Sequence, residues 1–514
     1  MRKFSYAISA FVLTACGGGG GAPSVAPSVA VNSNPATPAV VVDQPYFTEI
    51  ANAFSDPKQH SWFSNITKLF PNNTSHLGNV NTVVVADLDN DGRNEFIMVL
   101  YKGLGHGNVG TYVSEPCRST TIIYTYRDNK FIDVSDIYLD ADRDFKACIT
   151  DFNASVVDIN NDGKTDFFFS ANQEDGRRPD LGSEMTSPLV GWVSQSNGKY
   201  KIVNFAPNKW YHSIGSGIDS SGNTFVTGAG YPNHQVQNNR YIWNGREMQT
   251  IFDQYFPDIS PNSFVFLSRE GKASDLLIQH TWSKQMGAEG YYKENSIWYK
   301  TNVVSPTITE VAEETFQVWS GDKRKVTVLK VEGYHVVGTG GGSQLDSLAE
   351  CRLDKNQKSV AVGTYNIGII PNYVPGELIK EENTKVFVMP VSLDIKDKKL
   401  IMNKLTITGE SDFSPGKFQC LDVNKDGYDD LVLSLGNDKN LRHQRIYVNQ
   451  KDGTFKKLLV DNMVLHSKVR LYFSHMADFD NDGIMDIVAY PGNYYDDSSY
   501  VGAIKFYRGT KAIQ

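Results

Sequence analysis

The sequence predicts an all-β fold built from repeats, and three observations support this prediction. Short acidic loops of one pattern recur along the chain, and each leads into an apolar strand. Hairpins with an aromatic first strand recur between these loops. No long amphipathic helix pattern interrupts them. Because these elements form about seven units from residue 46 onwards, they indicate a β-propeller or a β-solenoid.

The acidic loop is clearest in MADFDNDGIMDIVAY, residues 476–490. Positions 1, 3, 5 and 9 of this loop are occupied by Asp478, Asp480, Asp482 and Asp486. Four carboxylates so close repel one another, but Ca²⁺ takes about six to eight oxygen ligands, and a glycine at position 6 permits the turn around it. Ile484 would add its backbone carbonyl. A polar turn without metal is the alternative for a single copy.

Three further copies stand in the same context, between an apolar lead-in and an apolar strand. They carry Asp87, Asp89, Asp91 and Glu95; Asp158, Asn160, Asp162 and Asp166; and Asp422, Asn424, Asp426 and Asp430. A turn needs polar residues, but it does not need a carboxylate or carboxamide at the same four positions every time. The recurrence therefore favours metal binding over a plain turn.

The aromatic hairpins complete each repeat unit. They are clearest around Tyr124, Trp192 and Tyr447, where an aromatic strand, a short polar turn and a second strand follow one another. Loop, strand and hairpin together make a unit that fits a four-stranded blade. Such a blade needs neighbours to cover its faces.

At this point the chain resembles the FG-GAP/VCBS repeats, whose hallmark is DxDxDGxxD before an apolar strand and which occur in integrin α-subunits and bacterial secreted proteins. The resemblance covers most of residues 80–514 and implies a seven-bladed propeller with about four Ca²⁺ sites. The middle blades, roughly 205–400, have lost the signature, so no calcium is expected at that position there. The ligands that the resemblance implies, with the position-7 residue giving its carbonyl, are Asp87, Asp89, Asp91, Arg93 and Glu95 of loop 1; Asp158, Asn160, Asp162, Lys164 and Asp166 of loop 2; Asp422, Asn424, Asp426, Tyr428 and Asp430 of loop 3; and Asp478, Asp480, Asp482, Ile484 and Asp486 of loop 4.

The N-terminus predicts export. A basic start is followed by the apolar stretch 4–12 and by Leu13-Thr14-Ala15-Cys16. Residues 1–15 read as a cleaved signal peptide and resemble a bacterial lipoprotein signal, which implies a lipid on Cys16. An ordinary signal peptide is the alternative. Gly17 after the cysteine favours the outer membrane of the cell envelope, with the periplasmic or the surface face left open. Residues 16–44 are a low-complexity tether, and 45–514 form the propeller.

The remaining cysteines fit an oxidising compartment, where they can pair. Cys117 and Cys148 bracket one hairpin and are the favoured pair, and Cys351 with Cys420 follows by elimination. Four cysteines permit about three connectivities, so spacing leaves the alternatives open.

Charge and motifs bear on function. The formal net charge is −8, much of the acidity lies in the four loops, and no basic run points to nucleic acid. We find no nucleophile elbow, HExxH or phosphate loop, and predict no catalytic residues. The sequence favours a non-enzymatic, lipid-anchored binding or adhesion module for an unknown protein or glycan. An envelope polysaccharide-active enzyme, a lyase or hydrolase on a propeller scaffold, and an assembly or scaffold lipoprotein are the alternatives.

Overall fold

The computed structural model of this chain describes 21 segments, all of which belong to one compact unit, Gln44–Gln514. The described residues are 45–54, 79–102, 118–139, 144–145, 154–170, 189–205, 213–219, 221–229, 239–251, 263–269, 272–279, 315–320, 325–333, 343–354, 360–369, 385–396, 399–408, 418–433, 445–459, 472–491 and 504–513. Cys16, Cys117 and Cys148 lie outside them. In this part of the chain, no helix is both long enough and apolar enough to span a bilayer.

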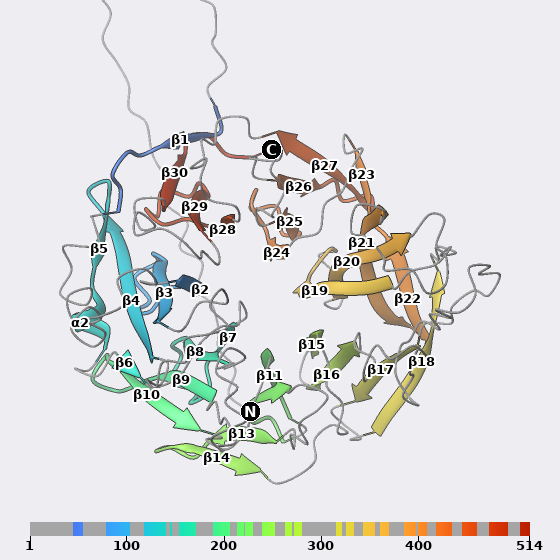
Figure 1. Cartoon of the computed structure of the whole chain (residues 1–514), viewed down its shortest axis with the longest axis horizontal. Coiled ribbons are helices and arrows are strands. Elements are labelled where there is room, and N and C mark those ends of the chain that lie inside the picture. The colour runs from blue at the N-terminus through green and yellow to red at the C-terminus, as the bar shows by residue number, and fades with distance from the viewer. Residues whose placement is uncertain are drawn as a thin grey trace, which may run out of the picture. The chain divides into compact units, whose positions relative to one another are not determined.

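The strands of this unit form sheets arranged around a common centre (Figure 1), which is the all-β propeller expected from the repeats. The first three sheets are antiparallel, and their four main strands follow chain order. Their strands are β2 (Asn79–Ala86), β3 (Glu95–Lys102), β4 (Arg118–Arg127) and β5 (Lys130–Asp133), with β6 (Asp144–Phe145) paired to β4; β7 (Ala154–Val157), β8 (Asp166–Phe169), β9 (Leu189–Ser194) and β10 (Tyr200–Phe205); and β11 (Ser213–Ile218), β12 (Thr224–Ala229), β13 (Arg240–Trp243) and β14 (Met248–Ile251). One short helix, α2 (Ser135–Tyr138), follows β5.

The expectation of seven separate blades is wrong for the described strands, which form six sheets. The cause is a parallel pairing of β18 with β22, which joins two sets of four antiparallel strands into one eight-stranded sheet. Its strands are β15 (Ser263–Arg269), β16 (Lys272–Gln279), β17 (Thr315–Ser320), β18 (Lys325–Gly333), β19 (Ser343–Cys351), β20 (Val360–Ile369), β21 (Lys385–Lys396) and β22 (Lys399–Lys404).

The last two sheets carry loops 3 and 4, and the second of them joins the two ends of the unit. Their strands are β23 (Thr406–Thr408), β24 (Phe418–Leu421), β25 (Asp430–Leu433), β26 (Arg445–Asn449) and β27 (Thr454–Leu459); and β28 (Tyr472–Ala477), β29 (Asp486–Pro491), β30 (Lys505–Gly509) and β1 (Phe47–Glu49). Because β1 pairs with β30, the first strand of the unit completes the sheet formed by the last three. An ion pair between Lys505 Nζ and Glu49 Oε1, 2.8 Å apart, reinforces this closure.

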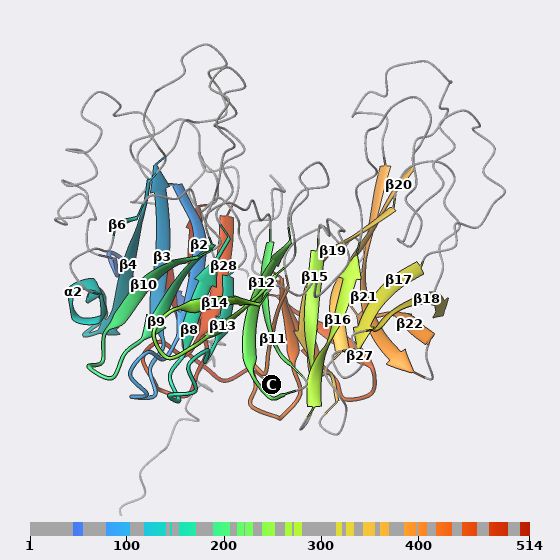
Figure 2. The same ribbon diagram turned by 90° about the horizontal axis from the view of Figure 1, so that it is seen from below.

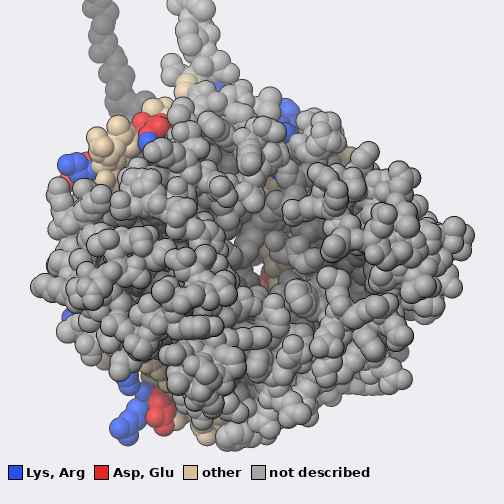
Figure 3. All heavy atoms as spheres, in the orientation of Figure 1, with Lys and Arg blue, Asp and Glu red and all other residues tan. Residues whose placement is uncertain are grey.

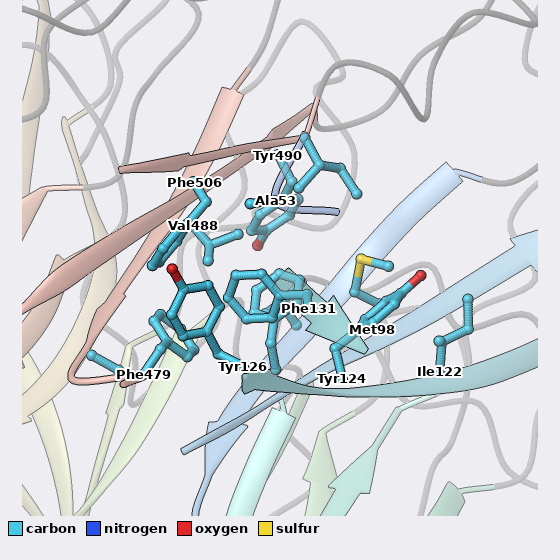
Figure 4. Packing of buried hydrophobic residues seen from close by; sticks show 14 residues of the cluster. Ala53, Met98, Ile122, Tyr124, Tyr126, Phe131, Phe479, Val488, Tyr490 and Phe506 are labelled. Atoms are coloured by element: carbon cyan, nitrogen blue, oxygen red, sulfur yellow. The ribbon is translucent and has the colours of Figure 1, made fainter. Parts of the chain in front are cut away.

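The hydrophobic core lies between neighbouring sheets. One cluster combines residues of the first sheet, such as Phe96 and Tyr124, with Phe479 and Phe506 of the closing sheet. Figure 4 shows Tyr124 and Phe131 of the first sheet together with Phe479 and Phe506 in this cluster. Burial of this apolar area, at roughly 25 cal/mol per Å², is what each sheet gains from its neighbour. The predicted dependence of a blade on the next one therefore has a direct structural basis.

The predicted hairpins are present as β4–β5, β9–β10 and β26–β27. Their aromatic residues Tyr124, Trp192 and Tyr447 are fully buried. The two-residue turn of β4–β5 is Asp128-Asn129, with φ of 52° and 60°. Positive φ at both central residues is the type I′ geometry, which matches the twist of the strands and which Asp and Asn tolerate.

A disulfide joins Cys351, at the end of β19, to Cys420 in β24. This is the pair that the sequence gives by elimination. It links the eight-stranded sheet to the sheet of loop 3, over a sequence separation of 69 residues. Closing so long a loop stabilises the folded state mainly by restricting the unfolded chain, typically by about 2 to 4 kcal/mol.

Surface charge is mixed where it can be seen. In Figure 3, described Lys, Arg, Asp and Glu side chains come into view at the rim, where blue and red atoms lie close together, and inside the central opening. The described charged side chains in this view therefore do not form a patch of a single charge sign.

Candidate metal centre

The four acidic loops occupy the same place in four sheets. Each joins an edge strand of its sheet, counted here as the first, to the strand beside it, namely β2 to β3, β7 to β8, β24 to β25 and β28 to β29. Figure 2 shows the loops after β2 and β7 together at the lower edge of the view. Contacts link consecutive loops: Asn90 Nδ2 donates to Gly163 O at 3.5 Å, and Asn94 Nδ2 donates to Asp478 O at 3.3 Å.

The backbone of all four loops follows one path. Position 6 is Gly92, Gly163, Gly427 or Gly483, with φ between 83° and 91°. Any side chain there would be strained, which explains the glycine. Position 4 is also left-handed, with φ near 58° at Asn90, Asn161 and Asn481 and 59° at Lys425. Asn tolerates this conformation better than Lys does.

The carboxylate at position 1 accepts two backbone N–H groups of the turn. In loop 1, Asp87 Oδ1 accepts the Asp91 N–H at 3.2 Å, and Oδ2 accepts the Gly92 N–H at 2.9 Å. The same pair of hydrogen bonds recurs at Asp158, Asp422 and Asp478.

Positions 3 and 5 orient their carboxyl or amide oxygens toward the same turn. In loop 4, Asp480 Oδ1 accepts the N–H of Asp482, and Asp482 Oδ1 accepts the N–H of Ile484 at 2.8 Å. The position-7 residues Arg93, Lys164 and Tyr428 make the same N–H donation in the other loops. Positions 1, 3 and 5 of each loop are thus oriented by the same turn.

Position 9 is the most constrained residue of each loop. Asp166, Asp430 and Asp486 are fully buried, and each accepts two backbone N–H groups from different places. One donor is position 2 of the same loop: Ile159, Val423 or Phe479, at 2.9 to 3.0 Å. The other is the last residue of the third strand: Ser194, Asn449 or Gly509, at 2.7 to 2.8 Å. The position-9 carboxylate therefore fastens the loop to its sheet.

In loop 1 the position-9 residue is a glutamate, and its longer side chain also joins the loop to its sheet. Glu95 is 1% exposed, and its Oε2 accepts the Leu88 N–H at 2.9 Å. The Thr125 side chain on the third strand supplies the second hydrogen bond.

Close packing brings the third strand of the closing sheet against loop 4. A Cβ placed on Gly509 would lie 2.5 Å from Ile484 Cγ2 and from Met485 O. Glycine at this position lets the Gly509 N–H reach Asp486.

Two loops gather acids most tightly. Asp87, Asp89 and Glu95 have carboxylate oxygens within 4.8 Å of one another, and so have Asp478, Asp480 and Asp486. Among the described residues, no other three acids, cysteines or histidines meet this distance. Loops 2 and 3 carry Asn160 and Asn424 at position 3, so one of their converging oxygens is a carboxamide. An all-oxygen donor set of this kind fits a hard cation such as Ca²⁺.

The loops also contact side chains that the sequence pattern did not single out. The Tyr138 hydroxyl donates to Asp89 Oδ2 at 2.7 Å, and the Ser194 hydroxyl donates to Asp162 Oδ2 at 2.7 Å. Lys451 Nζ lies 3.1 Å from Asp426 Oδ2, and Arg508 Nε lies 2.6 Å from Asp480 Oδ2. These partners come from the helix α2, from other strands and from a turn, so spacing within a loop carries no signal of them.

The decayed loop of the third sheet, between β11 and β12, carries an internal cation. Asp219 stands at its first position, and Arg240 Nη1 lies 3.2 Å from Asp219 Oδ2. The Arg240 side chain is 4% exposed and also lies over the Phe225 ring, 5.7 Å from its centre. A guanidinium therefore neutralises the remaining carboxylate of this loop.

Burial raises the pKa of the position-9 carboxyl groups. The pKa of Glu95, Asp430 and Asp486 rises to about 7, and that of Asp166 to about 6, first because burial disfavours the charged form. The backbone N–H donors lower these pKa values in part, and the neighbouring loop carboxylates raise them further. A bound cation would favour the ionised forms.

The raised pKa values predict the pH dependence of the metal-free protein. A group whose pKa is higher in the folded state gives its full stabilisation below its unfolded pKa, about 4 for a carboxyl. That stabilisation is lost as the pH rises through the folded pKa of about 6 to 7. In chelator, the free energy of unfolding should therefore fall between about pH 4 and 7, as measured by denaturant titration.

Asp486→Asn provides the control for this pH dependence. Its amide NH₂ cannot accept the second N–H, so stability should be lower at every pH. The decline with pH should nevertheless be shallower, because one titrating group is gone. A stability in chelator that rises from pH 4 to 7 would contradict the assignment.

Comparison with known proteins supports the repeat assignment. A model of the FG-GAP-like repeat matches residues 422–489, from position 1 of loop 3 to β29 beyond loop 4. A search of curated proteins found no match. Similar solved structures include the Bacillus licheniformis rhamnogalacturonan lyase PL11, at 12% identity and a TM-score of 0.40 over 85% of this chain and 72% of that chain. The exotype rhamnogalacturonan lyase YesX is 10% identical, with a TM-score of 0.40 over 85% and 73%.

The hydrazine synthase of Kuenenia stuttgartiensis is also similar, at 9% identity and a TM-score of 0.36 over 68% of this chain and 81% of that chain. Likenesses at this level do not bear on activity. The repeat match over residues 422–489 and the arrangement of the sheets together support an FG-GAP β-propeller.

Proposed function

We propose that this protein is a calcium-stiffened β-propeller that presents a binding surface for a protein or glycan at the bacterial cell envelope. The observation that carries the proposal is the repeated geometry of the four loops. In each, oxygen atoms from positions 1, 3 and 5 are oriented by the same turn, while position 9 is hydrogen-bonded to the sheet.

Calcium suits this geometry better than other cations. The donors are carboxylate and carboxamide oxygens, without a described cysteine or histidine in the clusters. Mg²⁺ demands a near-ideal octahedron and gives up its waters reluctantly. A flexible oxygen cage with a glycine turn accommodates the larger ion.

Stiffening follows from position 9. A cation among the carboxylates offsets their repulsion. The position-9 carboxylate then joins the ordered loop to the sheet, because it accepts one backbone N–H from the loop and one from the third strand. Propellers carry their specificity in loops on a rigid scaffold. Calcium would therefore keep the scaffold rigid, and the ligand would contact loops outside the four cages.

The proposed location in the cell envelope rests on the N-terminal sequence. A lipid on Cys16 followed by a tether over 16–44 would hold the propeller at a membrane surface, with the outer membrane favoured by Gly17. A protein or glycan of the envelope is the partner that such a position offers. The absence of a basic run in the sequence argues against nucleic acid.

The calcium assignment predicts about four bound ions per chain, measured by metal analysis after dialysis. Each site held at about 100 times its Kd stabilises the fold by about 2.7 kcal/mol, so melting temperature should rise strongly with calcium and little with Mg²⁺. Asp91→Ala should remove one ion and lower the melting temperature in calcium. Ser221→Ala, at position 3 of the decayed loop, should leave the stoichiometry unchanged. If metal analysis finds almost no calcium and the melting curves with and without calcium coincide, the loops are ordinary turns and the calcium assignment is wrong.

The anchor assignment predicts that Cys16→Ser moves the protein from the membrane fraction to the soluble fraction. Its melting curve in calcium should match that of the unaltered protein, because residue 16 precedes the propeller. Fractionation of expressing cells with a salt wash measures this. Quantitative retention of the variant with membranes would mean that Cys16 is not the anchor.

The binding function predicts a calcium-dependent ligand. The Cys16→Ser protein should retain a component of a glycan and surface-protein array in calcium and release it in chelator, because the loops that hold the sheets lose their cation. Asp91→Ala should weaken this retention. If the array glycan is instead cleaved, so that products accumulate and no stable complex forms, the protein is a polysaccharide-active enzyme and the binding role is wrong.

A further inference from the structure

Arg508 differs from every residue at the matching place in the other calcium-loop sheets. The third strands can be aligned by their pairing, since Tyr507 lies opposite Ile487, as Tyr447 lies opposite Leu431 and Trp192 lies opposite Phe167. The next residue is Arg508 in the closing sheet, but Val448 and Val193 in the others. Both valines are buried. In the first sheet the corresponding residue is Thr125, after Tyr124 opposite Phe96.

The guanidinium of Arg508 contacts two predicted calcium ligands of loop 4. Its Nε lies 2.6 Å from Asp480 Oδ2, and its Nη2 lies 3.2 Å from Asp482 Oδ2. The backbone fixes this arrangement, because the next residue, Gly509, donates its N–H to Asp486. Positions 3, 5 and 9 of one loop are thus tied to two adjacent residues of β30.

A second cation lies near the same loop. Lys425 Nζ, from position 4 of loop 3, is 3.6 Å from Asp478 Oδ2. Its side chain is 55% exposed, whereas that of Arg508 is 40% exposed and that of Asp480 only 11%. Solvent screens the lysine more, so Arg508 exerts the stronger field at this loop.

The decayed loop shows that this chain uses guanidinium in such a place. There, Arg240 pairs with Asp219 at 3.2 Å after the other acids of the pattern have been lost. Loop 4 keeps all four acids and has the arginine as well. Loop 4 thus has both the four acids of a predicted calcium loop and a guanidinium like the one that neutralises the decayed loop.

We propose that Arg508 is a built-in counter-cation that sets the calcium affinity of loop 4 below that of loop 1. The inference rests on the proposed calcium function. A divalent ion bound at loop 4 must either share Asp480 and Asp482 with the guanidinium or displace it, and both options cost binding free energy. Without calcium, Arg508 offsets the repulsion of the same carboxylates. Loop 4 would then lose less of its order than loop 1 does when the ions are removed.

The test is calorimetric calcium titration of the Cys16→Ser protein and its variants. The Cys16→Ser protein without further substitutions should show several tight calcium sites and one weaker site. Asp482→Asn should abolish the weaker site, and Asp91→Asn should remove one from the tight class. Arg508→Gln should tighten the weaker site by about tenfold or more, because it removes a charge a few ångströms from the ion. Arg508→Lys, which keeps the charge, should leave that site weak.

Two controls separate charge from packing. Lys451→Gln, beside Asp426 of loop 3 but 49% exposed, should change its site less than Arg508→Gln changes loop 4. In chelator, Arg508→Gln should lower the melting temperature, since the carboxylates lose their counter-cation. A purely structural arginine would give that loss without any gain in calcium affinity.

The outcomes are distinct. If Arg508→Gln leaves the affinity of loop 4 unchanged or weakens it while the chain still binds several ions, the role of Arg508 is wrong and the calcium function stands. If no variant and no unaltered protein takes up calcium, the proposed function itself fails.

Discussion

The buried carboxylate at position 9 is the constraint on which the repeat depends. In loops 2, 3 and 4 its two oxygens accept one N–H from the start of the loop and another from the end of the third strand, at 2.7 to 3.0 Å. Hydrogen bonds to a charged acceptor contribute about 1.5 to 3 kcal/mol each, and removing the acceptor leaves two buried donors unsatisfied. One side chain therefore couples the order of a surface loop to the register of three strands.

This coupling makes charge the central problem of the fold. The same burial that makes the hydrogen bonds strong raises the pKa of Asp486 to about 7, since desolvation disfavours its charged form. The chain offers three kinds of compensation: an oxygen cage fit for a cation in loops 1 and 2, a cage with added basic side chains in loops 3 and 4, and a lone guanidinium in the decayed loop. The sheets then pack face to face, so order gained in one loop reaches its neighbours through shared clusters such as Phe96 with Phe479.

Much of the architecture was predictable from local pattern. The loop positions and the aromatic hairpins follow from spacing and composition, because turns and strand alternation are local properties. The Cys351–Cys420 pair was reached only by elimination, since spacing leaves the connectivity of four cysteines open. The joining of two sets of strands by β18 and β22 could not be predicted from local pattern. These strands are about 70 residues apart, and neither strand's own sequence shows that it will pair with the other in parallel. Arg508 and Arg240 were missed for a related reason. Their contacts depend on the register of β30 and β13 against other segments, whereas the calcium pattern is read within nine residues.

Hydrogen exchange at the two donors of Asp486 tests the coupling most directly. Mass spectrometry can follow peptides that contain Phe479 and Gly509 in calcium and in chelator. The account predicts that both peptides lose protection together when calcium is removed, and that Asp486→Asn makes both exchange fast even in calcium. Protection that is the same in calcium and chelator, or that is lost at Phe479 while Gly509 stays protected, would show that the carboxylate does not join the metal loop to the sheet.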